Sequence, residues 1–146
     1  MLVRAAVKTD VTFILQLQQR WSEEDNTHGF VPESRRHIEN ELASYLVAEV
    51  GGRVVGFVSG AVRTSEGTAV IPAGESYYDV ANLYVMPEFR SRGIGGGLIT
   101  RLLTQAKQQG VSYALVYSAA KNIKEVLKFY ERHDFQSWYV QMFRKL

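Results

Sequence analysis

The spacing of apolar and polar residues predicts one strand and two helices in the first third of the chain. The apolar-rich stretch from Leu2 to Val7 predicts the strand. Apolar residues then recur at helical spacing, and Thr9 or Asp10 is expected to cap that helix. The positions expected to face inward are Phe13, Ile14, Leu17 and Trp21. After an acidic, loop-like break over residues 22–29, Pro32 is expected to open a second helix.

The middle of the chain predicts antiparallel sheet. Tyr45–Val50 and Val54–Val62 have strand-like composition, and the glycine pair between them is typical of a two-residue hairpin turn. A loop over residues 64–75 leads to a third strand of the sheet, from about Tyr77 to Val85.

The pattern in the rest of the chain predicts a unit of strand, helix and strand, in that order. A further helix and a closing strand follow it. A glycine turn leads into a helix with one apolar stripe that ends at Gly110. Val111–Tyr117 predicts a parallel strand buried on both faces, reached by a right-handed crossover. A last helix, Lys121–Arg132, precedes a strand over Phe135–Phe143, whose apolar alternation also allows a homodimer. The order predicts one domain of mixed α/β (α+β) class over residues 1–146.

Composition limits the function without deciding it. The 46% hydrophobic and 22% charged residues, the formal charge of +2 and the pI near 8.9 do not favour nucleic acid as a partner. The absence of cysteine excludes a disulfide, a thiolate metal site and an acyl-cysteine intermediate. The three histidines share no metal-ligand spacing, so no metal is expected. Without a signal-like or membrane-length apolar segment, a cytoplasmic protein with no membrane partner is expected.

The segment from Leu83 to Leu98 carries the most informative chemistry in the chain. An apolar strand passes through a glycine turn flanked by Arg90 and Arg92 directly into an amphipathic helix. Glycines allow successive backbone N–H groups to converge on one point, and the following helix adds unpaired amides and the positive end of its dipole. The segment therefore predicts a binding site for a pyrophosphate.

Two common pyrophosphate-binding loops do not match this segment. A Walker loop needs Lys and then Ser or Thr after its last glycine, whereas Gly97 is followed by Leu98 and Ile99. A Rossmann turn needs glycine at its sixth place, which Leu98 occupies, and an acidic residue after the next strand, which residues 118–121 lack. The segment therefore does not favour a nucleotide triphosphatase, and it excludes a dinucleotide-binding turn.

The pattern Arg90-x-x-Gly93-x-Gly95, after a strand that reads Leu-x-Val-x-Pro, resembles the acyl-CoA loop of the GNAT superfamily of N-acetyltransferases. The order of the expected elements is similar to the GNAT fold along essentially the whole chain. The resemblance implies a mixed, mostly antiparallel central sheet with a βαβ acyl-CoA-binding unit and flanking helices. It also implies that acetyl-CoA is the co-substrate and that the sheet splays open between the strand ending at Val85 and the one beginning at Val111.

The same resemblance implies which residues hold the coenzyme. The main chain of Leu83, Tyr84 and Val85 is implied to meet the thioester oxygen and the pantetheine arm. The loop implied to bind the pyrophosphate consists of Arg90, Ser91, Arg92, Gly93, Ile94, Gly95, Gly96 and Gly97. Asn122 resembles an asparagine that contacts the pantetheine arm, although the family's usual spacing falls on Ile123. Capping of the last helix is the alternative role for Asn122.

Two side chains are candidates for the proton transfers. An alkyl ammonium group, with a pKa near ~10.4, must lose a proton before it can attack. In histone-type members a glutamate stands six places before the residue that matches Val85, and the shorter Asp79 holds that place here, so a bridging water is needed. Tyr130 matches the tyrosine of the family's Tyr-x-x-x-Gly-Phe pattern, with Asp134 in place of the glycine, and is implied to protonate the departing sulfur. A solvated Asp79 and a Tyr130 that only packs are the alternatives.

The resemblance implies that acidic residues in two loops lie on the side where the acceptor binds. Glu24 and Glu75 are reserve bases and candidate substrate-binding residues, with a solvated surface as the alternative. Together, these features predict an N-acetyltransferase that moves an acetyl group from acetyl-CoA to a primary amine, of a small molecule or a protein, by direct attack in a ternary complex. The alternative is a non-catalytic acyl-CoA-binding sensor or regulatory module.

Overall fold

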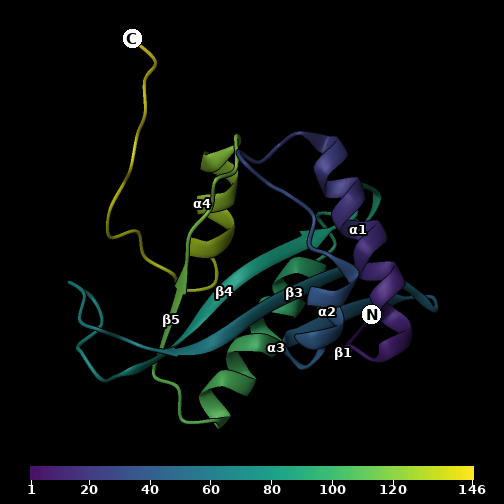
Figure 1. Cartoon of the computed structure of the whole chain (residues 1–146), viewed down its shortest axis with the longest axis horizontal. Coiled ribbons are helices and arrows are strands. Elements are labelled where there is room, and N and C mark those ends of the chain that lie inside the picture. Colours follow the sequence, from purple (N-terminus) through teal and green to yellow (C-terminus); the bar gives the residue numbers. More distant parts are fainter.

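Five strands form one sheet in the computed structural model, which describes all 146 residues (Figure 1). They lie across the sheet in chain order as β1 (Leu2–Ala5), β2 (Tyr45–Val50), β3 (Arg53–Thr64), β4 (Ser76–Val85) and β5 (Tyr113–Val116). The first four strands are antiparallel to their neighbours, and β5 runs parallel to β4. The mixed, mostly antiparallel sheet predicted from the sequence is therefore confirmed.

The β2–β3 hairpin follows directly from local sequence. Gly51 and Gly52 have φ angles of 58° and 77°, in the left-handed region that strains residues carrying a Cβ. Such a pair closes a two-residue turn whose twist matches that of antiparallel strands. Behind the turn, Val47, Val55 and Phe57 are fully buried and lie at the centre of the core.

Helices cover both faces of the sheet. They are α1 (Val11–Glu24), α2 (Arg35–Asn40), α3 (Ile94–Gln108) and α4 (Ile123–Glu131). Tyr84 of β4 stacks on Trp21 of α1, with ring centroids 5.5 Å apart, whereas the next residue, Val85, faces Gly95 in the first turn of α3. Adjacent residues of a strand point to opposite faces, so α1 and α3 lie on opposite sides of the sheet.

The sheet opens between β4 and β5. The two strands pair only over Tyr77–Val80 of β4 and Tyr113–Val116 of β5. From Ala81 onward β4 keeps β3 on one side and has no strand on the other, and the two ribbons diverge (Figure 1). The splay that the family resemblance implied is therefore present, and it leaves the last part of β4 with a free edge.

Three local predictions near the N-terminus differ from the structure. Asp10 makes no capping hydrogen bond to α1, because the Arg4 guanidinium holds its two carboxylate oxygens at 2.6 and 3.1 Å. Phe13 is 45% exposed, because α1 turns other apolar positions toward the sheet. The second helix does not begin at Pro32: Ser34 caps it, and its Oγ accepts a hydrogen bond from the His37 amide at 3.1 Å.

The predicted closing strand over Phe135–Phe143 is wrong. From Arg132 onward the chain forms neither helix nor strand, and the end of the chain runs away from the body, past α4 (Figure 1). Apolar alternation makes a strand only where another strand supplies hydrogen-bond partners, and this segment forms no ladder with any strand of the sheet. As a consequence β5 is the edge of the sheet, and it is partly exposed instead of buried on both faces.

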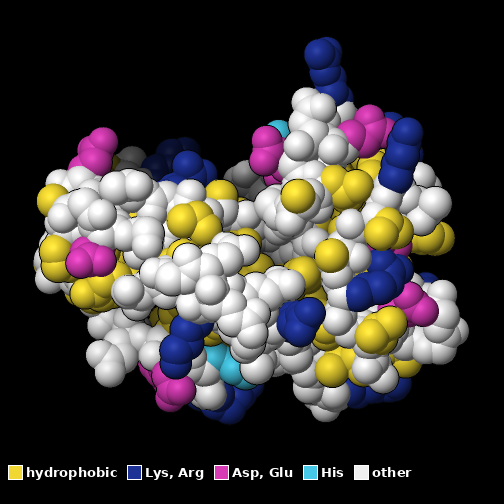
Figure 2. All heavy atoms as spheres, turned by 90° about the horizontal axis from the view of Figure 1, so that it is seen from below, with side chains coloured by type: hydrophobic (Ala, Val, Ile, Leu, Met, Phe, Trp, Pro, Cys, Tyr) yellow, Lys and Arg dark blue, Asp and Glu magenta, His cyan; other side chains and the backbone are white.

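Charged side chains are mixed on the surface. Figure 2 shows one face of the molecule, where basic and acidic side chains lie among apolar ones without a large field of one sign. A nucleic-acid interface usually gathers its basic residues on one face, so this face does not have that character. No helix combines the length and the apolar composition that a crossing of the bilayer requires.

Candidate functional site

The glycine turn between β4 and α3 presents a row of free backbone amides. Ser91 and Gly93 have φ angles of 58° and 77°, and this left-handed geometry turns the chain sharply into α3 at Ile94. The first hydrogen bond of the helix runs from the amide of Gly97 to the carbonyl of Gly93, at 2.9 Å. The amides of residues 91–96 therefore donate to no acceptor of the chain. Free N–H groups gathered at a helix N-terminus form a binding site for an anion.

The open edge of β4 extends this row of donors into the splay. The amide of Met86 donates to the carbonyl of Val55 on β3 at 2.9 Å. Amides of an antiparallel strand alternate in direction, so those of Leu83 and Val85 point away from β3. No strand receives them there, because β5 pairs with β4 only as far as Val80. The family resemblance implies that this stretch of main chain meets a thioester oxygen, and these two N–H groups are free to do so.

Helix α4 and the residues just after it pack closely against the first turn of α3. A Cβ on Gly95 would lie 3.3 Å from the ring of Phe129, and a Cβ on Gly96 would lie 3.1 Å from the ring of His133. These glycines therefore let two helices approach each other, in addition to exposing amides. This second role had no signal in the sequence, because Phe129 and His133 are distant along the chain.

Tyr130 follows Phe129 on α4 and packs against the hydrophobic core. Its ring makes edge-on contacts with Phe129 and Phe135, with centroids 5.0 and 5.4 Å apart. Burial raises the pKa of the Tyr130 phenol to about 12. A phenol with this pKa keeps its proton at neutral pH, which is the state that the predicted general acid requires. The ring also packs against Phe129 and Phe135, so the alternative role of Tyr130 as a packing residue is present as well.

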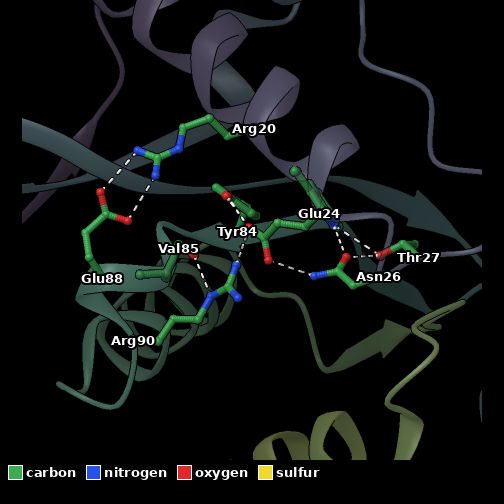
Figure 3. Close-up of polar contacts among 9 residues, drawn as sticks. Arg20, Glu24, Asn26, Thr27, Tyr84, Val85, Glu88 and Arg90 are labelled. Atoms are coloured by element: carbon green, nitrogen blue, oxygen red, sulfur yellow. Dashed lines mark hydrogen bonds and ion pairs between the residues drawn. The ribbon is translucent and has the colours of Figure 1, made fainter.

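Glu24, the last residue of α1, ties three elements together (Figure 3). Its carboxylate accepts hydrogen bonds from the Tyr84 hydroxyl at 2.5 Å, the Arg90 guanidinium at 2.7 Å and the Asn26 side-chain amide at 3.0 Å. Arg90 also donates from Nε to the carbonyl of Val85, at 2.8 Å (Figure 3). One carboxylate therefore links α1, β4 and the glycine turn.

These contacts bear on the predicted roles of Glu24 and the two arginines. The chain's own side chains donate to both oxygens of the Glu24 carboxylate, so a structural role suits this residue better than that of a base. The Arg90 guanidinium points at Glu24 and Val85, which suits it to hold the end of β4 in place. Arg92 lies over the ring of Phe89, 5.4 Å from its centroid, and its side chain has no carboxylate partner. Contact of either arginine with phosphate stays a prediction.

Asp79 and Glu75 lie away from the free edge of β4. Asp79 accepts a hydrogen bond from Nε of Arg63 at 2.8 Å. At about 3.3 Å per residue, its backbone lies roughly 13 Å from that of Leu83. Glu75 is exposed and directly precedes the first residue of β4. Along the strand, its backbone lies roughly 30 Å from that of Tyr84, whose hydroxyl contacts Glu24. The structure therefore does not bring Glu75 and Glu24 to one acceptor site.

The last helix begins at Ile123, two residues later than predicted, so Asn122 stands directly before α4, but its side chain makes no capping hydrogen bond. Only its backbone carbonyl accepts, from the amides of Glu125 and Val126 at 3.1 and 3.4 Å. The capping alternative is therefore not supported. The exposed side chain leaves pantetheine contact as a prediction.

An aromatic stack beside Tyr84 could not be identified from the sequence. Trp21 stacks on Phe30 and on Tyr84, with centroids 4.1 and 5.5 Å apart. Its indole N–H donates to the side chains of Asn26 and Thr27, at 3.2 and 3.1 Å. These residues come from α1, the loop after it and β4, so no spacing links them. The stack anchors the loop after α1 against the end of β4.

A comparison with family models finds the Acetyltransferase (GNAT) family over residues 11–135. The matched region runs from α1 through the glycine turn to the residues just after α4. The chain belongs to the GNAT acetyltransferase family. The resemblance predicted from the loop pattern is therefore confirmed, and the domain is an acetyltransferase by family.

Similar proteins agree with this assignment. An uncharacterized N-acetyltransferase of Methanocaldococcus jannaschii is 30% identical over 99 residues, which cover 68% of this chain and 42% of that protein. The aligned part thus spans less than half of that relative. A predicted acetyltransferase from Clostridium acetobutylicum, crystallised with acetyl-CoA, is 21% identical with a TM-score of 0.71, covering 97% of this chain and 94% of that one.

A third similar structure is an aminoglycoside acetyltransferase from an uncultured soil metagenomic sample. It is 18% identical, has a TM-score of 0.73 and covers 99% of this chain and 95% of that chain. At such identities the likeness of the two solved structures shows the fold, which is the mixed sheet with flanking helices described above.

Proposed function

We propose that this domain transfers an acetyl group from acetyl-CoA to the nitrogen of a primary amine. The observation that carries the proposal is the row of backbone donors that runs from Leu83 and Val85 at the splay to residues 91–96 at the start of α3. Donors at a helix N-terminus suit a diphosphate, and donors inside a splay suit the oxygen of a thioester. Acetyl-CoA carries both groups, and the similar Clostridium protein was crystallised with it.

Each step of the transfer has a candidate group in the chain. Acetyl-CoA supplies an activated acetyl thioester. The amides of Leu83 and Val85 stabilise the negative charge that develops on the thioester oxygen. Asp79 accepts the proton that the ammonium loses, through bridging water because of its separation from Leu83. Tyr130 donates a proton to the sulfur as the carbon–sulfur bond breaks and the nitrogen–carbon bond forms.

Release of the CoA thiol tests this proposal. The chain has no cysteine, so a thiol reagent reports the coenzyme alone. We expect saturable release with at least one class from a panel of a polyamine, an aminoglycoside, free amino acids and a lysine-containing peptide. A second candidate, an acyl-CoA sensor, is favoured by the ion pair that occupies Asp79. The sensor function is correct if CoA stabilises the fold, no amine in the panel gives thiol release, and Tyr130→Phe changes neither result.

Replacing Asp79 by asparagine is expected to lower kcat about 100-fold near neutral pH, the low end of the effect of a general base. The loss should shrink as the pH rises toward the amine pKa of ~10.4, because more of the amine is then already neutral. Steady-state rates across this pH range measure it. As a control, Glu75→Gln removes an exposed carboxylate beyond the far end of β4 and should leave kcat unchanged. Equal loss of thermal stability in Asp79→Asn and Arg63→Gln, with unchanged kcat, would show that Asp79 only pairs with Arg63.

Replacing Glu24 by glutamine is expected to weaken acetyl-CoA binding more than it lowers kcat. The variant keeps the shape of the side chain but removes the charge that holds Arg90, and a hydrogen bond to a charged group contributes about 1.5–3 kcal/mol. Because part of this energy is recovered through water, we expect KM to rise about fivefold. Glu23→Gln is the matched control, since Glu23 is exposed and bonds only to Gln19 of its own helix. A fall in kcat with unchanged KM would instead assign Glu24 to the acceptor.

A further inference from the structure

Asn82 of β4 directly precedes Leu83, whose free amide is the proposed donor to the thioester oxygen. Its side chain is partly buried and points to the face of the sheet on which α1 lies. This direction follows because Tyr84, two residues further on, stacks on Trp21 of α1. The glycine turn leads into α3 on the opposite face, so coenzyme bound at that turn leaves the α1 face of the splay to the acceptor.

A β-bulge in β4 turns Asp79 to the same face as Asn82. Asn82 pairs with Ser59 of β3. Asp79, three residues earlier, pairs with Ala61, which is only two residues after Ser59, so β4 holds one extra residue here. Residues three apart in a regular strand point to opposite faces, whereas residues two apart point to the same one. The proposed base and Asn82 therefore face the acceptor from the same side.

A chain of buried hydrogen bonds runs from Asn82 to Glu33, in the loop before α2. Nδ2 of Asn82 donates to Oγ of Ser59 at 3.3 Å, and the Ser59 hydroxyl hydrogen-bonds to that of Tyr45. The Tyr45 hydroxyl donates to Oε2 of Glu33 at 2.5 Å, and Nε2 of Gln18 donates to the same oxygen at 2.6 Å. Ser59, Tyr45 and Gln18 are almost completely buried, so the chain is shielded from solvent.

The carboxylate at the far end sets the direction of each donor in this chain. An ionised carboxylate only accepts hydrogen bonds. Burial and the Glu33 carboxylate raise the pKa of the Tyr45 phenol, so the phenol keeps its proton and donates it to Glu33. The Tyr45 oxygen then accepts from Ser59, and the Ser59 oxygen accepts from the NH₂ group of Asn82. The Asn82 amide is thereby held with Nδ2 toward Ser59 and Oδ1 away from it.

The Oδ1 atom of Asn82 is free and accessible. No N–H or O–H group of the chain donates to it. No buried side-chain oxygen or nitrogen lacks a hydrogen-bond partner, so this unpartnered oxygen is open to solvent. It therefore presents a fixed acceptor beside Leu83, on the face left to the amine.

We propose that Oδ1 of Asn82 accepts a hydrogen bond from the attacking amine and selects primary over secondary amines. Ser59, Tyr45 and Glu33 are then positioning residues, which act by fixing the Asn82 amide. A neutral primary amine has two N–H bonds and one lone pair. One N–H donates to Asn82 and the other to the water that leads to Asp79, while the lone pair meets the thioester carbon. An N-methyl amine has a single N–H and loses one of these contacts. The inference rests on the acetyl transfer proposed above.

Thiol release with two matched amines gives the first test. They are a primary amine from the panel that supports release and its N-methyl analogue, and the ratio of their kcat/KM values is the preference. We expect Asn82→Leu, which removes the acceptor oxygen at similar volume, to lower this preference about fivefold, the net value of one hydrogen bond. The affinity for CoA, measured by calorimetry, should change little. Asn40→Leu is the matched control, because Asn40 is exposed at the end of α2.

Two further variants separate a contact with the amine from a structural role. Asn82→Asp keeps an oxygen in the place of Oδ1, so it should retain most of the preference that Asn82→Leu loses. Tyr45→Phe frees the Ser59 hydroxyl to donate to Oδ1 of Asn82, which allows the amide to turn over. It should therefore lower the preference by a smaller factor, about twofold, without changing the affinity for CoA. Circular dichroism checks the folding of each variant, and Asn82→Ala repeats the first test if Asn82→Leu does not fold.

The outcomes distinguish this inference from the proposed function. If the wild-type chain releases thiol and Asn82→Leu keeps the full preference for the primary amine, the role of Asn82 is overturned and the acetyl transfer stands. An equal loss of preference in Asn82→Leu and Asn82→Asp also overturns it, because the oxygen is then not what the amine contacts. If no amine gives release with the folded wild-type chain, the proposed function is overturned, and this inference with it.

Discussion

Replacing Tyr130 by phenylalanine is expected to lower kcat about 100-fold, the low end of the effect of a general acid. The low end applies because a thiol with a pKa near ~8.5 is already a fair leaving group. The ring and its contacts with Phe129 and Phe135 are kept, so the affinity for CoA should change little. Thiol release under saturating acetyl-CoA measures kcat, and calorimetry with CoA measures the affinity.

Comparison with a control variant across the pH range separates a proton donor from a ring that only packs. The pKa of Tyr130 is raised to about 12, so the phenol stays protonated throughout the range in which the amine acceptor titrates. The ratio of wild-type to variant kcat should therefore stay constant as the pH rises. Tyr139→Phe, which alters an exposed tyrosine near the C-terminus, should leave kcat unchanged. If Tyr130→Phe behaves like this control, the phenol has no part in the transfer.

Replacing Gly95 by proline is expected to weaken CoA binding about 10- to 100-fold, because it removes one backbone N–H from the glycine turn. A hydrogen bond to a charged group contributes about 1.5–3 kcal/mol, and each ~1.4 kcal/mol is tenfold in affinity. Proline is tolerated in the first turn of a helix, where this amide has no acceptor within the chain. Calorimetric titration with CoA measures the loss.

Gly95→Ala is the matched control for this prediction. Both variants add a Cβ that approaches the Phe129 ring to about 3.3 Å, so both should lose a similar amount of thermal stability. Only proline removes the amide. Equal CoA affinities in the two variants would mean that the Gly95 amide does not bind the diphosphate, and an undetectable affinity in the folded wild-type chain would remove the basis of the proposed function.

Local sequence predicted the parts of the candidate site that consist of backbone. The left-handed φ at Gly93, the helix that begins at Ile94 and the free amides between them depend on neighbouring residues. The turn at Gly51 and Gly52 follows for the same reason. Patterns of this kind are reliable because steric limits on φ and ψ act within one or two residues.

Side-chain partnerships were predicted much less well. Arg90 is bound to Glu24, 66 residues away, and Asp79 is bound to Arg63 on the neighbouring strand. The sequence makes Glu24 and Asp79 candidate bases. It does not show that side chains of the protein donate to both oxygens of Glu24, or that Asp79 is ion-paired with Arg63. Such contacts depend on how α1, β3 and β4 pack against one another.

The sequence by itself determined the family, the mixed sheet and the glycine turn with its free amides, because glycine placement and apolar spacing act locally. Only the tertiary structure decided which carboxylates are already paired, how closely α4 approaches Gly95 and Gly96, and what becomes of Phe135–Phe143. That last segment alternates as a strand does, yet it forms none within the chain. A strand requires a hydrogen-bonding neighbour at the right distance, and the supply of such a neighbour is a property of the folded assembly.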